Sequence, residues 1–315
     1  HVSMESVWSG MNAQGVPVPD GTYTYRTSGT YLRVKNGTKV IAASEMLTGE
    51  VVVDSTAPLP AVTITPAPNN NGWNKTDVTI ELTAADAGSG VAATYYATDG
   101  GATVEGTALG LASEGAHEVQ FWSVDNAGNS EEPKLIEVRI DKTSPAIWVV
   151  SRTPPNALGW NKAPVEVVYG VADALSGVDT NAGGYEADVV GTEGADQTAS
   201  GSVVDMAGNP SGITVQHVNI DMTPPAILSL VPADGATTTN AQQAVTTTYG
   251  DPLSGIRTES TVLLVAGINV TSQAVVTAEG LVYAPPAPFV EGDVSVSLSL
   301  QDLADNLRSI TTTFH

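Results

Sequence analysis

The chain has 315 residues, enough for two or three domains that each bury a core, and it contains no cysteine for a disulfide or a thiolate site. It carries 34 acidic and 12 basic side chains, a net charge of −22, which disfavours binding to nucleic acid or anionic membrane and favours binding to cations. No apolar run approaches the roughly 20 residues of a membrane span, and the start, His1-Val2-Ser3, lacks the features of a signal peptide, so we interpret the chain as a processed or excised mature segment.

Residues 1–54 fit about half of a β-sandwich. Trp8-Ser9-Gly10 and Gly15 precede the run Pro19-Asp20-Gly21-Thr22-Tyr23-Thr24-Tyr25, whose alternation predicts a strand. The arrangement resembles the second half of the immunoglobulin-like domain of flagellar hook-capping proteins, which implies that the Thr-Tyr-Thr-Tyr run is an inner strand. Either the domain was cut upstream, or another copy of the chain supplies the missing strands at an open sheet edge.

From residue 54 onward, four short motifs recur in the same order. They are Asp-x-Thr-x-Pro, beginning at Asp54, Asp141 and Asp221; Gly-Trp-Asn-Lys, beginning at Gly72 and Gly159; Asp-x-x-Ser-Gly, beginning at Asp86, Asp173 and Asp251; and Asp-x-Ala-Gly-Asn, beginning at Asp125 and Asp205, with a degenerate copy at Asp302. The period of roughly 80 residues is too long for a solenoid repeat and suits a small sandwich domain.

Between the motifs, apolar and polar residues alternate as they do in half-buried strands, for example over residues 78–84, 91–98, 119–124 and 135–140. No stretch of ten or more residues has helical periodicity. The pattern predicts an all-β rod of tandem immunoglobulin- or fibronectin-III-like β-sandwich domains with seven short strands each. The predicted domains are a partial one at 1–54 and three full ones at 55–141, 142–221 and 222–315.

The strand order of such a sandwich predicts where the recurrent acids lie. With 78–84 as strand B and 91–98 as strand C, Asp86 lies in the B–C turn, and with 119–124 as F and 135–140 as G, Asp125 lies in the F–G turn. Both turns face the incoming linker, which carries Asp54. Three acids should therefore meet at each junction between domains: Asp54, Asp86 and Asp125; Asp141, Asp173 and Asp205; and Asp221, Asp251 and Asp302.

Two interpretations of these acids stay open. Asp and Asn side chains bond nearby backbone groups, so each motif alone is explained as a turn or a linker. Three clustered carboxylates repel one another, however, and Ca²⁺ gathers roughly six to eight oxygen ligands in a flexible shell. The convergence of three motifs on one end of each domain favours calcium, with Asn129, Asn209 and Asn306 as further ligands.

Residues 54–315 resemble the bacterial immunoglobulin-like repeats of large surface proteins, including giant non-fimbrial adhesins. The resemblance lies in the Asp-x-Thr-x-Pro linkers and the Asp-x-Ala-Gly-Asn turns. It implies calcium at the domain junctions that stiffens a rod, and it extends by motif match to Asp54, Asp125, Asp141, Asp205 and Asp221. The third unit departs from the pattern, because an acid, Asp305, replaces the turn glycine and changes the turn.

The sequence offers few other candidate residues. His117 and His217 are the only histidines that are not chain ends, and we expect both to be exposed strand residues and not parts of a Ser-His-Asp or zinc site. Trp73 and Trp160 are expected in the turn between strands A and B, where they cover the core; a carbohydrate platform is the alternative.

We therefore expect a non-enzymatic, extracellular or cell-surface protein that serves as a stalk, an adhesin segment or a filament subunit. Its expected partners are neighbouring domains or further copies of the chain, including copies in head-to-tail order, and a cell-surface or glycan partner. The alternative is a non-catalytic spacer or carbohydrate-binding accessory of a secreted hydrolase.

Overall fold

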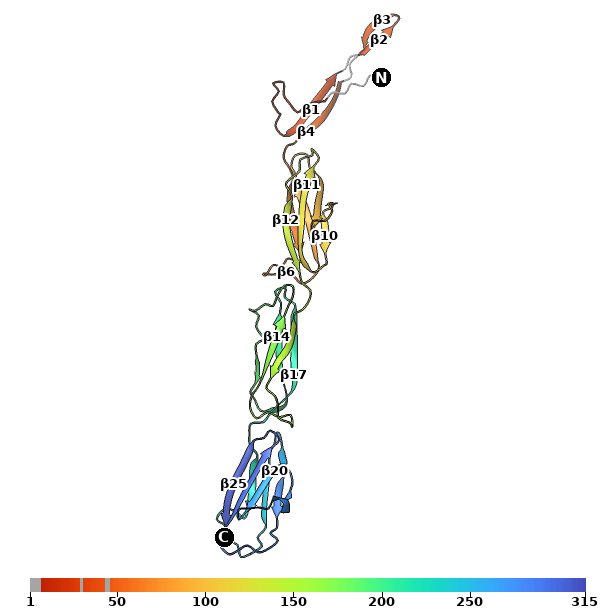
Figure 1. The fold of residues 1–315 in the computed structure, drawn as a ribbon. Helices are drawn as coiled ribbons and strands as arrows, with labels where there is room; N and C mark the ends of the chain where they lie inside the picture. Colours follow the sequence, from red (N-terminus) through yellow and green to blue (C-terminus); the bar gives the residue numbers. More distant parts are fainter. Residues whose placement is uncertain (1–6, 29–30, 43–45) are drawn as a thin grey trace. The chain divides into compact units, whose positions relative to one another are not determined.

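The computed structural model describes residues 7–28, 31–42 and 46–315 (Figure 1). The inferred processed start at His1 falls within residues 1–6 and so lies outside the described residues, as do 29–30 and 43–45. Within the described ranges the structure is built of strands, and its helical element is one short 3-10 turn, η1 (Thr271–Gln273). The prediction of an all-β chain of tandem sandwiches is confirmed.

The N-terminal strands form two separate antiparallel pairs. β1 (Gly21–Ser28) pairs with β4 (Met46–Val53), and β2 (Tyr31–Lys35) pairs with β3 (Thr38–Ala42). The connection between β2 and β3 is Asn36-Gly37, and both residues have positive φ, at 50° and 82°. Asn-Gly is the pair that a two-residue type I′ hairpin turn favours, so local sequence explains this hairpin.

The first sandwich has two sheets, in the orders β10-β7-β5 and β6-β12-β11-β8-β9. In β7, Val78, Ile80 and Leu82 are buried and the residues between them are exposed, so the alternation in the sequence decides which face packs on the core. β11 and β12 lie side by side in the yellow part of Figure 1. The strands are β5 (Leu59–Thr65), β6 (Trp73–Asn74), β7 (Val78–Ala85), β8 (Val91–Thr98), β9 (Val104–Glu105), β10 (Ala108–Leu111), β11 (Gly115–Asp125) and β12 (Lys134–Ile140).

The second sandwich has fewer strands than expected. Its sheets are β13-β14-β15 and β16-β17, which makes five strands instead of seven: β13 (Ala146–Arg152), β14 (Val165–Ala172), β15 (Asp188–Val190), β16 (Gly194–Val204) and β17 (Pro210–Ile220). In the place of strand C, Val178 makes a single bridge to Asp205. Gly183 and Gly184 follow with positive φ, and this turn backbone interrupts a continuous strand there.

The third sandwich pairs the sheets β18-β19-β23-β22 and β21-β20-β24-β25. Every second residue of β24 is buried, which places Leu298 and Leu300 in the core. The strands are β18 (Ala226–Val231), β19 (Val245–Gly250), β20 (Ile256–Val265), β21 (Ile268–Asn269), β22 (Val275–Val276), β23 (Gly280–Tyr283), β24 (Val294–Asp302) and β25 (Leu307–Phe314).

The chain divides into two compact units. Unit 1 contains residues 1–143 and 206–209, and unit 2 contains residues 144–205 and 210–315. Three separate buried clusters form the cores of the three sandwiches. The predicted domain limits stay a prediction, and each unit is described by itself below.

Candidate metal centre

Three acids that are distant in sequence meet in unit 1. Asp54 directly follows β4, Asp86 lies in the turn between β7 and β8, and Asp125 is the last residue of β11. Each offers a carboxylate oxygen, and these three oxygens lie within 4.8 Å of one another. The assignment of Asp86 to the B–C turn and of Asp125 to the F–G turn agrees with the observed strands.

Each turn acid also organises its own turn. Asp86 Oδ1 accepts hydrogen bonds from the backbone N–H of Gly88 (3.1 Å) and Gly90 (2.6 Å), and Asp125 Oδ1 accepts from Ala127 N–H (2.9 Å). The interpretation of these motifs as turns therefore describes real contacts. These turn contacts leave unexplained why the three acids converge.

The linker acid Asp54 is joined to the same two turns. Its Oδ2 accepts from Ser89 N–H (2.6 Å), and its backbone carbonyl accepts from the Asn129 amide (3.0 Å). Hydrogen bonds from Ser89 and from the Thr56 backbone lower the pKa of Asp54, which keeps this carboxylate ionised beside Asp125. The linker therefore approaches the sandwich through an ionised acid.

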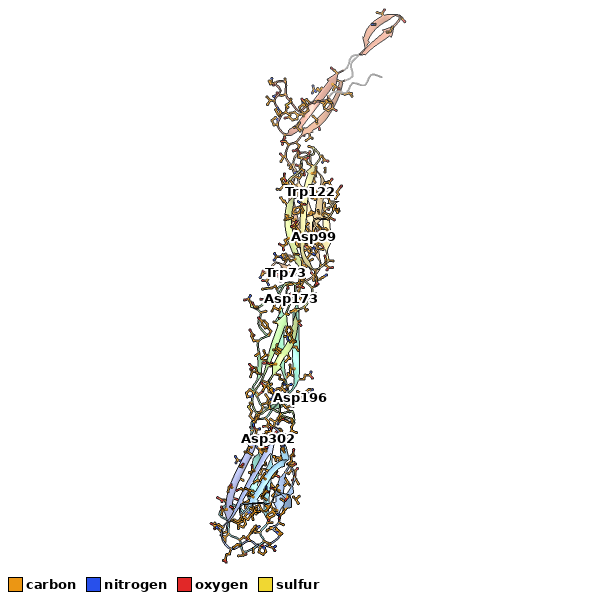
Figure 2. All side chains as sticks on the ribbon, in the orientation of Figure 1. Trp73, Asp99, Trp122, Asp173, Asp196 and Asp302 are labelled. Atoms are coloured by element: carbon orange, nitrogen blue, oxygen red, sulfur yellow. The ribbon has the colours of Figure 1, made fainter. Side chains whose placement is uncertain are left out.

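Unit 2 repeats the arrangement with deeper burial. Asp221, Asp251 and Asp302 also present carboxylate oxygens within 4.8 Å of one another. Asp221 and Asp302, which is labelled in Figure 2, are both fully buried. Asp221 Oδ2 accepts from Ser254 N–H (3.1 Å), in the same way that the linker acid of unit 1 contacts the B–C turn.

Charge and burial are unfavourable for ionised Asp302. Burial raises the pKa of Asp302 above its ordinary value, and the neighbouring charge of Asp221 raises it further, although hydrogen bonds from Asn306 oppose the shift. Ser254 and Asn161 each make a hydrogen bond with Asp221 through a backbone group: Ser254 N–H donates to the Asp221 carboxylate, and the Asn161 carbonyl accepts from Asp221 N–H. Their side-chain oxygens, Ser254 Oγ and Asn161 Oδ1, are buried and have no hydrogen-bond partner. A group of buried carboxylates is the kind of donor set that a hard cation takes.

The second predicted set of acids is divided between the two units, with Asp141 in unit 1 and Asp173 and Asp205 in unit 2. Because each unit is described by itself, the convergence of these three acids stays a prediction. Asp141 is fully buried, and its Oδ1 accepts from Thr143 N–H (3.0 Å). Asp173 Oδ1 accepts from Gly177 N–H (2.6 Å), and Asp205 is buried directly after β16. Asp141 and Asp173 therefore make the same kind of turn contact as the acids of the other two sets.

The asparagines of the F–G turns contact the linkers through their amide nitrogens. Asn129 Nδ2 donates to Asp125 Oδ2 (2.7 Å) and to the carbonyl of Asp54 (3.0 Å). Asn306 makes the two corresponding bonds in unit 2, and Asn209 bonds the carbonyl of its own linker acid. The role of these asparagines as cation ligands stays a prediction, and it would use the amide oxygen, since the nitrogen is engaged.

Two glutamates that the sequence analysis did not single out also hold the linkers. In unit 1, Glu114 Oε1 accepts from Lys142 N–H (2.6 Å) and from the Thr143 hydroxyl (3.0 Å). Glu193 makes the same pair of bonds to residues 222 and 223 in unit 2. Both glutamates precede a glycine that begins a long strand, so the repeated Glu-Gly pair was the signal that could have identified them.

The Gly-Trp-Asn-Lys loops provide a further contact. In unit 2, Asn156 Oδ1 accepts from the backbone of residues 158 and 160, and its Nδ2 donates to the Leu303 carbonyl (2.8 Å) and to Asp305 Oδ2 (2.9 Å). In unit 1, the half-buried Trp73 lies 6.0 Å from the guanidinium of Arg139. The Arg139 guanidinium covers part of the indole, which disfavours the alternative of a carbohydrate platform there.

The prediction that His117 is an exposed strand residue is wrong. His117 is 8% exposed, its Nδ1 lies 2.8 Å from Asp99 Oδ2, and its Nε2 lies 3.0 Å from the Ser113 carbonyl and 3.1 Å from Ser113 Oγ. The burial of His117 could not be predicted from the sequence, because Asp99 and Ser113 lie in turns whose approach to the strand has no local signal. His217 is exposed as expected, and it contacts Asp196.

The contacts of His117 suit a charged imidazolium that is hydrogen-bonded to two turns, one at Asp99 and one at Ser113. Its hydrogen bond to Asp99 raises the pKa of His117 above the ordinary 6.5, while burial acts in the opposite direction. With a carboxylate at Nδ1 and a carbonyl at Nε2, both ring N–H groups donate when the ring is charged. A proton directed at the Ser113 carbonyl leaves Nε2 unable to act as a base toward the Ser113 hydroxyl.

We expect the free energy of unfolding to fall as the pH rises above neutrality, in part because of His117. The folded-state pKa lies above the unfolded value, so the contribution is complete below about pH 6.5 and is lost as the pH rises through the folded-state pKa. Urea unfolding of the full chain at about pH 6 and about pH 8.5 measures this decline. His117→Gln should reduce the decline and His217→Gln should keep it; equal declines in wild type and His117→Gln would contradict the assignment.

Comparisons with known proteins show similarity in fold only. No family model matches the chain, and a search of curated proteins finds no match. A tetra-tandem repeat from the extending region of a large adhesion protein is 16% identical over 95% of this chain and 83% of its own length, with a TM-score of 0.31. Cadherin domains 1–5 of protocadherin gamma B2 are 11% identical, with coverage of 93% and 72% and a TM-score of 0.32.

Fibronectin-III-like modules of Clostridium thermocellum CbhA are 19% identical over 25% of this chain and 95% of their own, with a TM-score of 0.19. Scores this low carry no inference about what this chain binds. Among the described residues, no helix is long and apolar enough to cross a membrane.

Proposed function

We propose that the chain is a non-enzymatic, extracellular segment of tandem β-sandwiches that serves a surface stalk, an adhesin or a filament, and that Ca²⁺ binds at its junctions. One observation carries the proposal. In unit 2, the linker acid Asp221 and the turn acids Asp251 and Asp302 converge within 4.8 Å although two of the three are fully buried. Buried carboxylates are rare unless they are paired or bind a metal.

The chemistry of the donor set favours calcium among the common cations. The atoms that converge are carboxylate oxygens. Ser254 and Asn161, which make hydrogen bonds with Asp221, also carry buried oxygens that have no hydrogen-bond partner. Ca²⁺ accepts irregular shells of oxygen ligands, whereas Mg²⁺ demands a small octahedron and Zn²⁺ prefers nitrogen or sulfur. Binding would neutralise the repulsion among the three acids.

In this proposal, each protein group has a mechanical role. Asp221 belongs to the linker, and Asp251 and Asp302 belong to the two turns at the near end of the third sandwich. Asn306 and Ser254 already bond the linker acid, and they hold it against these turns. A cation shared by all three acids would add a bond between linker and sandwich and so limit bending at the junction.

Small-angle X-ray scattering tests this function on the full chain. We expect a chelator to broaden the distribution of distances, because the linkers then keep only their hydrogen bonds to the turns, and we expect excess Ca²⁺ to restore the narrow distribution. Excess Mg²⁺ is the control, and it should restore less. Scattering curves that coincide with and without chelator would remove calcium stiffening from the account.

A further inference from the structure

The N-terminal pair of strands has two faces of opposite character. The register pairs Tyr23 with Val51 and Tyr25 with Gly49, which places both tyrosines on one face together with Leu47. Thr22, Thr24, Arg26, Glu50 and Val52 alternate with them and lie on the other face. The first face carries no charged side chain, and the second carries both charges of the pair.

The apolar face is only half covered. Trp8 packs against Tyr23 with ring centroids 5.7 Å apart and covers one end of the face. At the other end, Tyr25 is 50% exposed and Leu47 is 66% exposed. Tyr25 lies across Gly49, where a Cβ atom would overlap its ring. A two-stranded sheet with one open apolar face is marginal in water and gains stability when a second layer covers it.

The charge distribution indicates what kind of layer fits. Residues 1–53 contain four acidic and four basic side chains, whereas the rest of the chain contains 30 acidic and eight basic ones and therefore carries the whole net charge of −22. A strongly charged partner finds no opposite charge to pair with on the face of Tyr25 and Leu47. The face instead matches an equally uncharged apolar surface, and the same face of another copy provides one on a segment that carries no net charge.

We propose that this face is a contact between two copies of the chain, in which the β1–β4 sheets pack face to face as the two layers of one sandwich. Aligned sheets pack about 10 Å apart through interdigitated apolar side chains, which the tyrosines and Leu47 provide. A two-fold axis through the contact brings the same residues of both copies together. The contact is independent of the calcium junctions, since β1 and β4 contribute no residue to the carboxylate groups.

Sedimentation velocity of the full chain over a range of concentrations tests the proposal. We expect a monomer–dimer equilibrium that Leu47→Glu weakens at least about tenfold, because it places two charges in the contact. The matched control is Val52→Glu, which changes an exposed residue of the same strand on the opposite face and should leave the dissociation constant within about twofold. Circular dichroism checks that both variants keep their strands.

The dependence on salt separates this contact from a charge-driven one. Because each copy carries −22, added NaCl should strengthen an apolar contact by screening the repulsion between the copies. The alternative is a contact in which the basic side chains between residues 26 and 39 dock onto an acidic surface of another copy. Such a contact would weaken with added salt and would survive Leu47→Glu. Either of those results, or a monomer at every concentration, overturns the proposal; the same dimer in Ca²⁺ and in chelator supports it.

Discussion

Calcium at about one hundred times its dissociation constant should raise the free energy of unfolding of unit 2 by about 2.7 kcal/mol, and Asp302→Asn should lose that increase. Asp302 is fully buried, as Asp221 is, and its carboxylate lies within 4.8 Å of the other two, so solvent cannot readily take its place in the proposed site. Urea unfolding of the full chain, followed with and without chelator, measures the difference. Without a cation, the amide keeps the oxygen that accepts from Ala304 N–H and Asn306 N–H but loses the acceptor for the Asn306 side-chain amide, so the substitution alone should lower the free energy of unfolding by about 1 kcal/mol.

A charge-matched variant distinguishes specific binding from general screening. Glu279→Gln removes one negative charge from an exposed position of the third sandwich, and it should keep the full calcium increase. If Asp302→Asn and Glu279→Gln respond equally to calcium, the stabilisation comes from screening of the net charge and not from the cluster.

Leu300→Ala is expected to be the most destabilising single change described here, at about 2 to 5 kcal/mol. Leu300 has no exposed surface, and it lies two residues before Asp302 on β24, where both side chains point inward. The substitution leaves a cavity in the third core beside the strand end that positions the acid. Denaturant unfolding of the full chain should show an earlier transition for unit 2.

Leu307→Ala is the control for this cavity. Leu307 begins β25 and is exposed, so its truncation should change the free energy of unfolding by about 0.5 kcal/mol or less. Comparable losses from Leu300→Ala and Leu307→Ala would contradict the assignment of Leu300 to the core.

Strands B and C of the first sandwich could be predicted almost to the residue because alternation and turn chemistry agree there, whereas strand F, expected at 119–124, begins four residues earlier as β11 (Gly115–Asp125). The run 91–98 is β8 without change, and 78–84 became β7 with one more residue, Ala85. The same alternation explains why Asp86 and Asp125 reach the same end of the sandwich. The prediction of seven strands failed in the second sandwich, where Gly183 and Gly184 interrupt the expected strand C.

The contacts that sequence could not predict depend on atoms that meet only in three dimensions. His117 is buried because Asp99 and Ser113 approach it from two turns, and no spacing in the chain signals that approach. The asparagines of the F–G turns were recognised, but which amide atom meets the linker depends on the register of the junction. Glu114 belongs to the repeated Glu-Gly pair, which is visible in the sequence. Its contact with the next linker, at residues 142 and 143, is not visible there.

Isothermal titration calorimetry of calcium into the full, chelator-washed chain tests the central claim most directly. We predict saturable binding with at least two sites per chain, one at Asp54, Asp86 and Asp125 and one at Asp221, Asp251 and Asp302, and the loss of one site in Asp302→Asn. A titration without saturable binding, or one that Asp302→Asn leaves unchanged, would contradict the claim that these carboxylate groups are calcium sites.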